Sequence, residues 1–154
     1  GDILLFDKAL KLTKQRYNSA KDKATTEREI KAMKAKGINC LCPEYPQPKW
    51  FYSLCDAIGL YVIDCAALAA PSSADNRDVD GTPSNDPLLV EEYLRRVDAM
   101  YRRAQNHVSI IAFSLGGNIG NGYNMYKAYE KLKAYGDSRP IIFEGAQGEW
   151  NSDI

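Results

Sequence analysis

The sequence has few metal-binding side chains, no excess of charge of either sign and no long apolar run. Its only histidine is His107, and none of its four cysteines forms a C-x-x-C pair, so neither a metal site nor a redox motif of that kind is expected. Lysine plus arginine equals aspartate plus glutamate, at 20 each, which disfavours nucleic acid as a partner. No run reaches the roughly 18 apolar residues of a membrane helix, and we expect neither a membrane partner nor a cofactor.

The cysteines are interpreted first as small buried side chains, because free cysteine behaves as a hydrophobe. They are Cys40, Cys42, Cys55 and Cys65. The alternative is a disulfide between Cys42 and Cys65, since both would lie near the ends of neighbouring strands.

The composition is that of an ordinary folded domain, with 45% hydrophobic and 26% charged residues. A chain of 154 residues is long enough for one core and short for two. No linker interrupts the sequence, so we predict a single domain over residues 1–154.

Helix signals recur along the chain. Thr26 and Glu29 have the capping-box spacing and predict a helix that runs to Lys36. Apolar residues at positions 51, 54, 55 and 58 follow the spacing of one helix face, with Gly59 as its end. Asp86 followed by Pro87 is typical of a helix start, and a last helix is predicted around Met125, Tyr129 and Leu132, ending at Gly136.

Short apolar runs alternate with these helices and predict strands. They occupy residues 10–12, which give the weakest signal, 38–42, 60–63, 110–113 and 140–143. Strands that alternate with helices of this length indicate a parallel sheet with right-handed crossovers. We therefore predict an α/β fold of about five parallel β/α units. Residues 71–85 are almost without apolar side chains and are predicted to form a mobile loop.

Three segments then resemble, in order, motifs of glycoside hydrolase family 2, the family of β-galactosidases. Residues 50–64 are similar to its W-Y-x-L-C-D-x-Y-G-L-Y-V-I-D-E, residues 106–116 to its N-H-P-S-V-I-I-W-S-L-G, and residues 137–145 to its D-x-x-R-P … Y-E-G. The resemblance implies a (β/α)₈ TIM barrel whose active site lies at the carboxyl ends of the strands. About five units amount to a partial barrel of this type.

The resemblance also implies that the catalytic acid/base is missing. The family's S-L-G-N-E carries that residue as its Glu, whereas residues 114–118 read S-L-G-G-N and place Asn118 there. The family's nucleophile would lie beyond residue 154. A retaining glycosidase needs two carboxyl groups about 5–5.5 Å apart, and an amide cannot carry the proton. We therefore expect no catalytic residue and no glycosidase activity.

Other departures fall at predicted strand ends. The family's R-x-S-H-Y-P becomes Leu41 to Pro46, with Glu44 in place of the His, and its D-E-A-N becomes residues 64–67, with Cys65 in place of the Glu. A carbohydrate remains the candidate ligand, and its weak candidate binding residues are Glu44, Asn118 and Glu144. The alternatives are an exposed loop acid for Glu44, a helix cap near Asn121 for Asn118, and a solvated strand-end residue for Glu144.

His107 is interpreted as a structural residue. In the resembling motif it precedes the fourth strand, on the face away from the catalytic one. We expect it to form a hydrogen bond to the backbone.

The function predicted from the sequence is a non-catalytic structural or interaction module of this family. The alternatives are a carbohydrate-binding module, or part of an active hydrolase completed by a longer chain or a partner. Five β/α units leave sheet edges and an inner face uncovered. We expect a homo-oligomer, a dimer in the first instance, to cover them; a cap from residues 1–24 or the missing barrel half are the other choices.

Overall fold

The computed structural model describes residues 2–18 and 20–154, with only the backbone of Asp2. One sheet of five parallel strands runs through it in the order β1-β2-β3-β4-β5. The strands are β1 (Lys14–Tyr17), β2 (Cys40–Pro43), β3 (Tyr61–Cys65), β4 (Ile110–Ser114) and β5 (Ile141–Ile142). The helices are α1 (Asp2–Ala9), α2 (Lys23–Ala35), α3 (Lys49–Ile58), α4 (Val90–Ala104) and α5 (Tyr123–Ala134).

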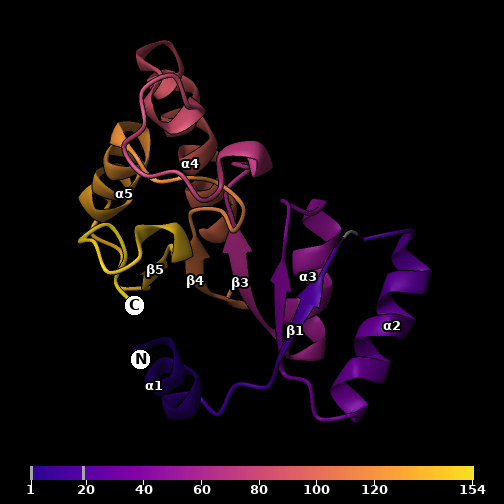
Figure 1. Ribbon diagram of the computed structural model, residues 1–154. Coiled ribbons are helices and arrows are strands. Elements are labelled where there is room, and N and C mark those ends of the chain that lie inside the picture. Colours follow the sequence, from indigo (N-terminus) through magenta and orange to yellow (C-terminus); the bar gives the residue numbers. More distant parts are fainter. Residues whose placement is uncertain (1, 19) are drawn as a thin grey trace.

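Each strand pairs with the next one along the chain, and a helix joins every pair. Helices α2 to α5 lie along the outside of the sheet, whereas α1 lies near the amino-terminal ends of the strands (Figure 1). This arrangement is the wall of a TIM barrel over five of the eight units. It confirms the predicted α/β fold and the parallel partial barrel.

Helix α3 shows how the sequence produces this wall. Its buried residues include Phe51, Leu54 and Cys55, the face that the apolar spacing predicts. Gly59 then adopts a left-handed conformation, with φ of 89°, and its N–H donates to the carbonyl of Cys55. A residue without a side chain makes that turn at low cost, and β3 starts two residues later.

The start of α2 was predicted wrongly. The helix is capped by Asp22, whose carboxylate accepts a hydrogen bond of 2.8 Å from the N–H of Thr25. Thr26 lies inside the helix and is fully buried, and its hydroxyl accepts a bond from the N–H of Lys21. The cap is therefore an aspartate that the capping-box pattern did not include.

The first strand was also misplaced. Residues 10–12 lie between α1 and β1, and β1 consists of the polar run Lys14–Tyr17, in which only Tyr17 is buried. An edge strand has one neighbour and an exposed face, so it does not require the apolar residues of a central strand. Leu12 instead packs on the inner face of the sheet.

Two apolar clusters lie on opposite faces of the sheet. The larger one fills the space between the sheet and helices α2 to α5 and includes Ile30, Phe51, Val97 and Met125. The smaller one, on the inner face, consists of Cys40, Ile63 and Ala112, with Phe6 of α1 packed against it. Helix α1 thus covers part of the face that would line the inside of a closed barrel.

Residues 71–85 contain two short 3₁₀ turns, Pro71–Ser73 and Pro83–Asn85. The hydroxyl of Ser84 donates to the carbonyl of Gly120 at 2.6 Å, and the N–H of Asp78 donates to the carbonyl of Asn121. These bonds attach the loop to the segment before α5, while its mobility remains a prediction. Asp86 caps the 3₁₀ turn Pro87–Leu89 that leads into α4.

Within residues 2–18 and 20–154, no helix has both the length and the apolar character needed to cross a bilayer.

Candidate functional site

A cavity of about 320 Å³ opens at the carboxyl ends of β1 to β4, the end at which barrels of this kind place their active sites. We call it the mouth. It is lined by Arg16, Cys42, Pro43, Glu44, Tyr45, Cys65, Leu68, Ala69, Ser114, Gly117 and Asn118. The parallel sheet therefore brings together residues from four separate strand ends.

Glu44 enters the mouth directly after β2. Its carboxylate forms an ion pair of 3.0 Å with the guanidinium of Arg16, and its backbone N–H donates to the carbonyl of Tyr17. The Arg16 side chain is 83% exposed, so the pair contributes little to stability. It leaves both charges available to a polar ligand.

Asn118 reaches the mouth from the turn after β4. Gly116 makes that turn with φ of 114°, and a Cβ there would meet the carbonyl oxygen of Leu68 at 2.6 Å. The carbonyl of Asn118 accepts a hydrogen bond of 2.8 Å from the N–H of Ala70, while the residue itself stays exposed. Asn118 does not cap α5, which begins at Tyr123 and has Gly122 as its N-cap residue, so this alternative was wrong.

Glu144 lies apart from the other two candidates. It begins the 3₁₀ turn Glu144–Ala146 after β5, is exposed, and does not line the mouth. The structure thus brings Glu44 and Asn118 to one cavity and leaves Glu144 outside it. Of the described residues that line the mouth, Glu44 alone carries a carboxyl group.

Sequence reasoning missed Arg16 and the thiol lining of the mouth. Arg16 was overlooked because the first strand had been placed at residues 10–12. Cys42, Cys65 and Ser114 follow one another on neighbouring strands, and the polarity of strand ends in a parallel sheet was the signal that could have grouped them.

The cysteines are free thiols, three of them buried and Cys42 half-buried. The disulfide between Cys42 and Cys65 is therefore not formed. The register pairs Leu41 with Val62, so Cys65 lies two residues beyond the position opposite Cys42, an offset of about 6.6 Å along the strand. Added to the spacing between strands, this offset exceeds the reach of a disulfide. Burial raises the pKa of Cys65 to about 12.

Asp64, which precedes Cys65, faces the helices and not the mouth. It is fully buried and accepts hydrogen bonds from the Tyr52 hydroxyl, at 2.7 Å, and from the Arg103 guanidinium, at 3.0 Å. Burial raises the pKa of the Asp64 carboxyl, and the Arg103 charge opposes that rise. This group joins β3 to α3 and α4 and so holds the end of β3 in place.

His107 lies before β4, at the opposite end of the sheet from the mouth, as predicted. Its Nδ1 lies 2.7 Å from a carboxylate oxygen of Asp56, whose other oxygen accepts from the N–H of Ser109. The partner is therefore a carboxylate and not the backbone. Burial alone would raise the pKa of Asp56, but the hydrogen bonds from Ser109 and His107 outweigh it and lower the pKa.

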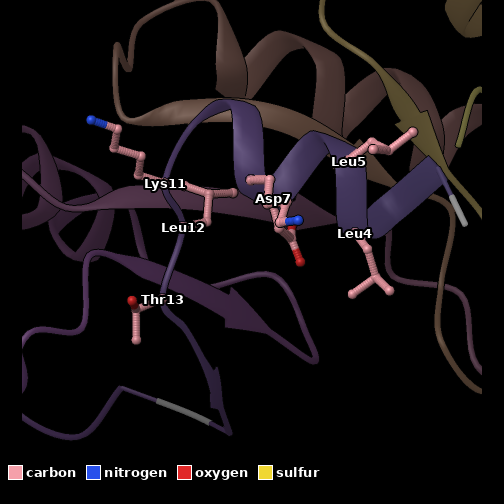
Figure 2. Close-up of a pocket in the computed structure, with 7 residues that line it drawn as sticks. Leu4, Leu5, Asp7, Lys11, Leu12 and Thr13 are labelled. Carbon is pink, nitrogen blue, oxygen red and sulfur yellow. The ribbon is translucent and has the colours of Figure 1, made fainter.

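A larger hollow of about 1000 Å³ lies beside α1, away from the mouth. Figure 2 shows Leu4, Leu5 and Asp7 on α1, with Lys11 to Thr13 on the segment that leads to β1. This hollow does not lie at the carboxyl ends of the strands, where a barrel places its active site.

In the part of the chain that the structure describes, no three or more His, Cys, Asp or Glu side chains are arranged to hold a metal ion.

Comparison with known sequences gives a consistent result. Residues 13–154 match the family model described as "Glycosyl hydrolases family 2, TIM barrel domain". The chain is 38% identical over 126 residues to a β-galactosidase of Vibrio cholerae, covering 80% of this chain and 12% of that protein. It is 37% identical over 119 residues to a β-galactosidase of Lactococcus lactis, covering 77% of this chain and 12% of that protein. The chain thus spans about 12% of the length of these curated relatives.

Solved structures share the fold at lower sequence identity. A β-glucuronidase of Parabacteroides merdae superposes with a TM-score of 0.64 and 18% identity, covering 86% of this chain and 17% of that one. A β-galacturonidase of Eisenbergiella tayi superposes with a TM-score of 0.67 and 16% identity, covering 84% of this chain and 24% of that one. At these identities the likeness concerns the fold alone.

Proposed function

The chain belongs to glycoside hydrolase family 2, and from this premise we propose that it forms a non-catalytic part of the family's barrel, in which the strand scaffold is kept and the proton-transfer site is lost. The observation that carries the proposal is Asn118. It stands where the family motif has its acid/base glutamate, and it is exposed at the mouth. Such a module acts through its structure or its contacts and does not break glycosidic bonds.

The retaining mechanism explains why the residue at position 118 is decisive for hydrolysis. In a retaining glycosidase the acid/base protonates the leaving oxygen and later deprotonates the attacking water. A carboxyl group does both because it exchanges a proton near working pH, whereas the amide of Asn118 does not titrate there. General acid–base assistance is typically worth about 10²–10⁴-fold in rate.

The other acids do not compensate for the amide. Glu44 enters the mouth from β2, on a different strand end from Asn118, and its carboxylate is paired with the guanidinium of Arg16. Glu144 lies outside the mouth. The mouth therefore lacks, among its described lining residues, the two facing carboxyl groups that the retaining mechanism requires.

The experiment is a hydrolysis assay of the purified chain with aryl β-galactosides, β-glucuronides and β-mannosides. We expect no turnover above that of buffer. Turnover that disappears in a Glu144→Gln or Glu44→Gln variant, with the fold retained by circular dichroism, would overturn the proposal. The two substitutions are nearly isosteric and remove only the titrating oxygen.

A second function, carbohydrate binding without turnover, is supported by the lining of the mouth. Arg16, Glu44, Ser114 and Asn118 offer charged, hydroxyl and amide groups around a cavity of about 320 Å³, and hydrogen-bonding groups of these kinds suit sugar hydroxyls. Calorimetric titration with the same sugars tests it. Saturable heat that is lost in Asn118→Ala supports binding, and no heat at millimolar sugar rejects it.

A further inference from the structure

An exposed tryptophan lies outside the mouth, in the segment that follows β5. Trp150 is 54% exposed although its ring stacks on Tyr126, with centroids 5.1 Å apart and planes at 21°. Tyr129 meets the same ring edge-on at 5.7 Å and 80°. Tyr126 and Tyr129 are three residues apart on α5 and so share one face of the helix. We call Trp150, Tyr126 and Tyr129 the aromatic platform.

The platform is held in place by hydrogen bonds behind it. The Tyr129 hydroxyl donates to Asp153 at 2.6 Å, and Asp153 also accepts from the Lys133 ammonium at 2.7 Å. The Tyr126 hydroxyl accepts from the amide of Asn121 at 3.4 Å. Because both tyrosines are anchored, the Trp150 ring is oriented before any ligand arrives, which lowers the entropy lost on binding.

Polar groups border the platform on the side of the Tyr126 hydroxyl. That hydroxyl donates to Asp78 at 3.5 Å, and the neighbouring Arg77 donates to the carboxylate of Glu149 at 3.4 Å and to the amide oxygen of Gln147 at 3.2 Å. The side chains of Arg77 and Glu149 are 37% and 43% exposed. The border thus offers donors and acceptors, and its main ion pair is neutral overall.

We propose that the aromatic platform is a binding site for a neutral pyranose ring, separate from the mouth. The face of a pyranose carries apolar C–H groups that pack on an aromatic ring, and its hydroxyls point outward, where donors and acceptors can bind them. One exposed ring among charged residues suits a sugar better than a protein partner, which would need a broad apolar patch. The choice of a sugar as the ligand rests on the proposed carbohydrate function. The location of the binding site rests on the stacked rings of the aromatic platform.

The chain allows a clean test because it has two tryptophans, Trp50 and Trp150. Trp50 lies in α3 and is half-buried against the core. A Trp50→Phe variant leaves Trp150 as the sole tryptophan reporter. Lactose and cellobiose, titrated to about 50 mM, exceed the millimolar affinity expected of one stacked sugar.

We expect a saturable change in Trp150 emission with these disaccharides, weakened about tenfold or more when Tyr126→Leu removes the stacked ring. In calorimetry, adding Trp150→Ala to the mouth variant Asn118→Ala should abolish the heat that remains in Asn118→Ala. The mouth variant Asn118→Ala should leave the Trp150 signal unchanged, so that failure of sugar binding at the mouth is separable from failure at the platform.

The proposal is overturned if neither disaccharide changes the Trp150 emission of a protein with a native circular dichroism spectrum. It is also overturned if the binding heat of the Asn118→Ala variant is unchanged when Trp150→Ala is added to it. A response to a glucuronide alone, with none to lactose or cellobiose, would contradict the assignment of a neutral sugar.

Discussion

At the scale of single residues, the thiols are distinguished by their environments. Cys42 is half-buried and lines the mouth, and a hydrogen bond from the Cys40 thiol lowers its pKa. Burial raises the pKa of Cys55 and of Cys65 to about 12. Reactivity toward alkylating agents follows the exposed thiolate, so these cysteines should differ sharply.

We predict that iodoacetamide modifies Cys42 first in the native protein, about tenfold or more faster than any other cysteine. Peptide mapping by mass spectrometry after timed quenching measures the order. Cys42→Ser should remove the fast phase, and Cys65→Ser, the matched control in the same cavity, should keep it. Equal rates for all four thiols would show that the burial pattern does not control access.

Asp56 should make stability depend on pH in the acid range. Its pKa is lowered in the folded state from an ordinary value of 3.8, so its contribution is present above that value and is lost as the pH falls through the folded pKa. Asp56→Asn should reduce the free energy of unfolding by about 1–3 kcal/mol at pH 7, because the Asn keeps the shape but loses the charged acceptor.

Urea unfolding of wild type and Asp56→Asn from pH 7 downward measures this difference. The two free energies of unfolding should converge once the pH falls below the folded pKa. A difference that stays constant over the whole range would mean that the Asp56 charge does not support the His107 and Ser109 contacts.

At the scale of secondary-structure elements, the buried ion pair between Asp64 and Arg103 connects β3 to α4. The Asp64 side chain is fully buried and that of Arg103 is 19% exposed. We predict that Arg103→Met lowers the free energy of unfolding by about 3–5 kcal/mol, because it leaves Asp64 without its counter-charge.

Chemical denaturation of Arg103→Met, Asp64→Leu and the double variant separates the contributions of the pair. The double variant should be more stable than Arg103→Met, since it removes the uncompensated charge together with its partner. If the double variant is the least stable of the three, the prediction is wrong. The pair would then stabilise the fold by more than each charge compensating the other.

The elements also show how much the sequence could predict. The central strands could be predicted because both of their faces are buried, which gives continuous apolar runs. The helices could be predicted because one face of each is buried, as in α3. The edge strand β1 was missed because the polar run Lys14–Tyr17 carries no apolar signal, and Arg16 was lost with it. At the site, the parallel topology was enough to group Glu44 with Asn118. The exclusion of Glu144 depends on the path of the chain after β5, which no local pattern encodes.

At the scale of the whole molecule, α1 carries exposed apolar side chains where it covers the inner face of the sheet. Leu4 and Leu5 are each 65% exposed beside the hollow of about 1000 Å³, and the strands β1 and β5 are the edges of the sheet. Apolar surface of this kind and unpaired edges favour association. We propose a homodimer formed through this face.

Size-exclusion chromatography with light scattering should give the mass of a dimer for wild type and of a monomer for the Leu4→Lys, Leu5→Lys double variant. Leu88→Lys is the matched control, because Leu88 is 89% exposed but lies on the 3₁₀ turn before α4. A wild-type monomer at high concentration would contradict the proposed dimer.

The absence of a proton donor at position 118 can be tested in a relative that is a β-galactosidase, the one of Vibrio cholerae. The segment of that protein that corresponds to the family motif S-L-G-N-E is replaced by Ser114–Asn118 of this chain, with a control in which the final Asn of the graft is changed to Glu. We predict that the graft lowers kcat/KM for galactosides with poor leaving groups by about 10²–10⁴-fold and that the control restores it. A graft that keeps kcat/KM within about tenfold of the parent, while the Asn remains in place, would contradict the account.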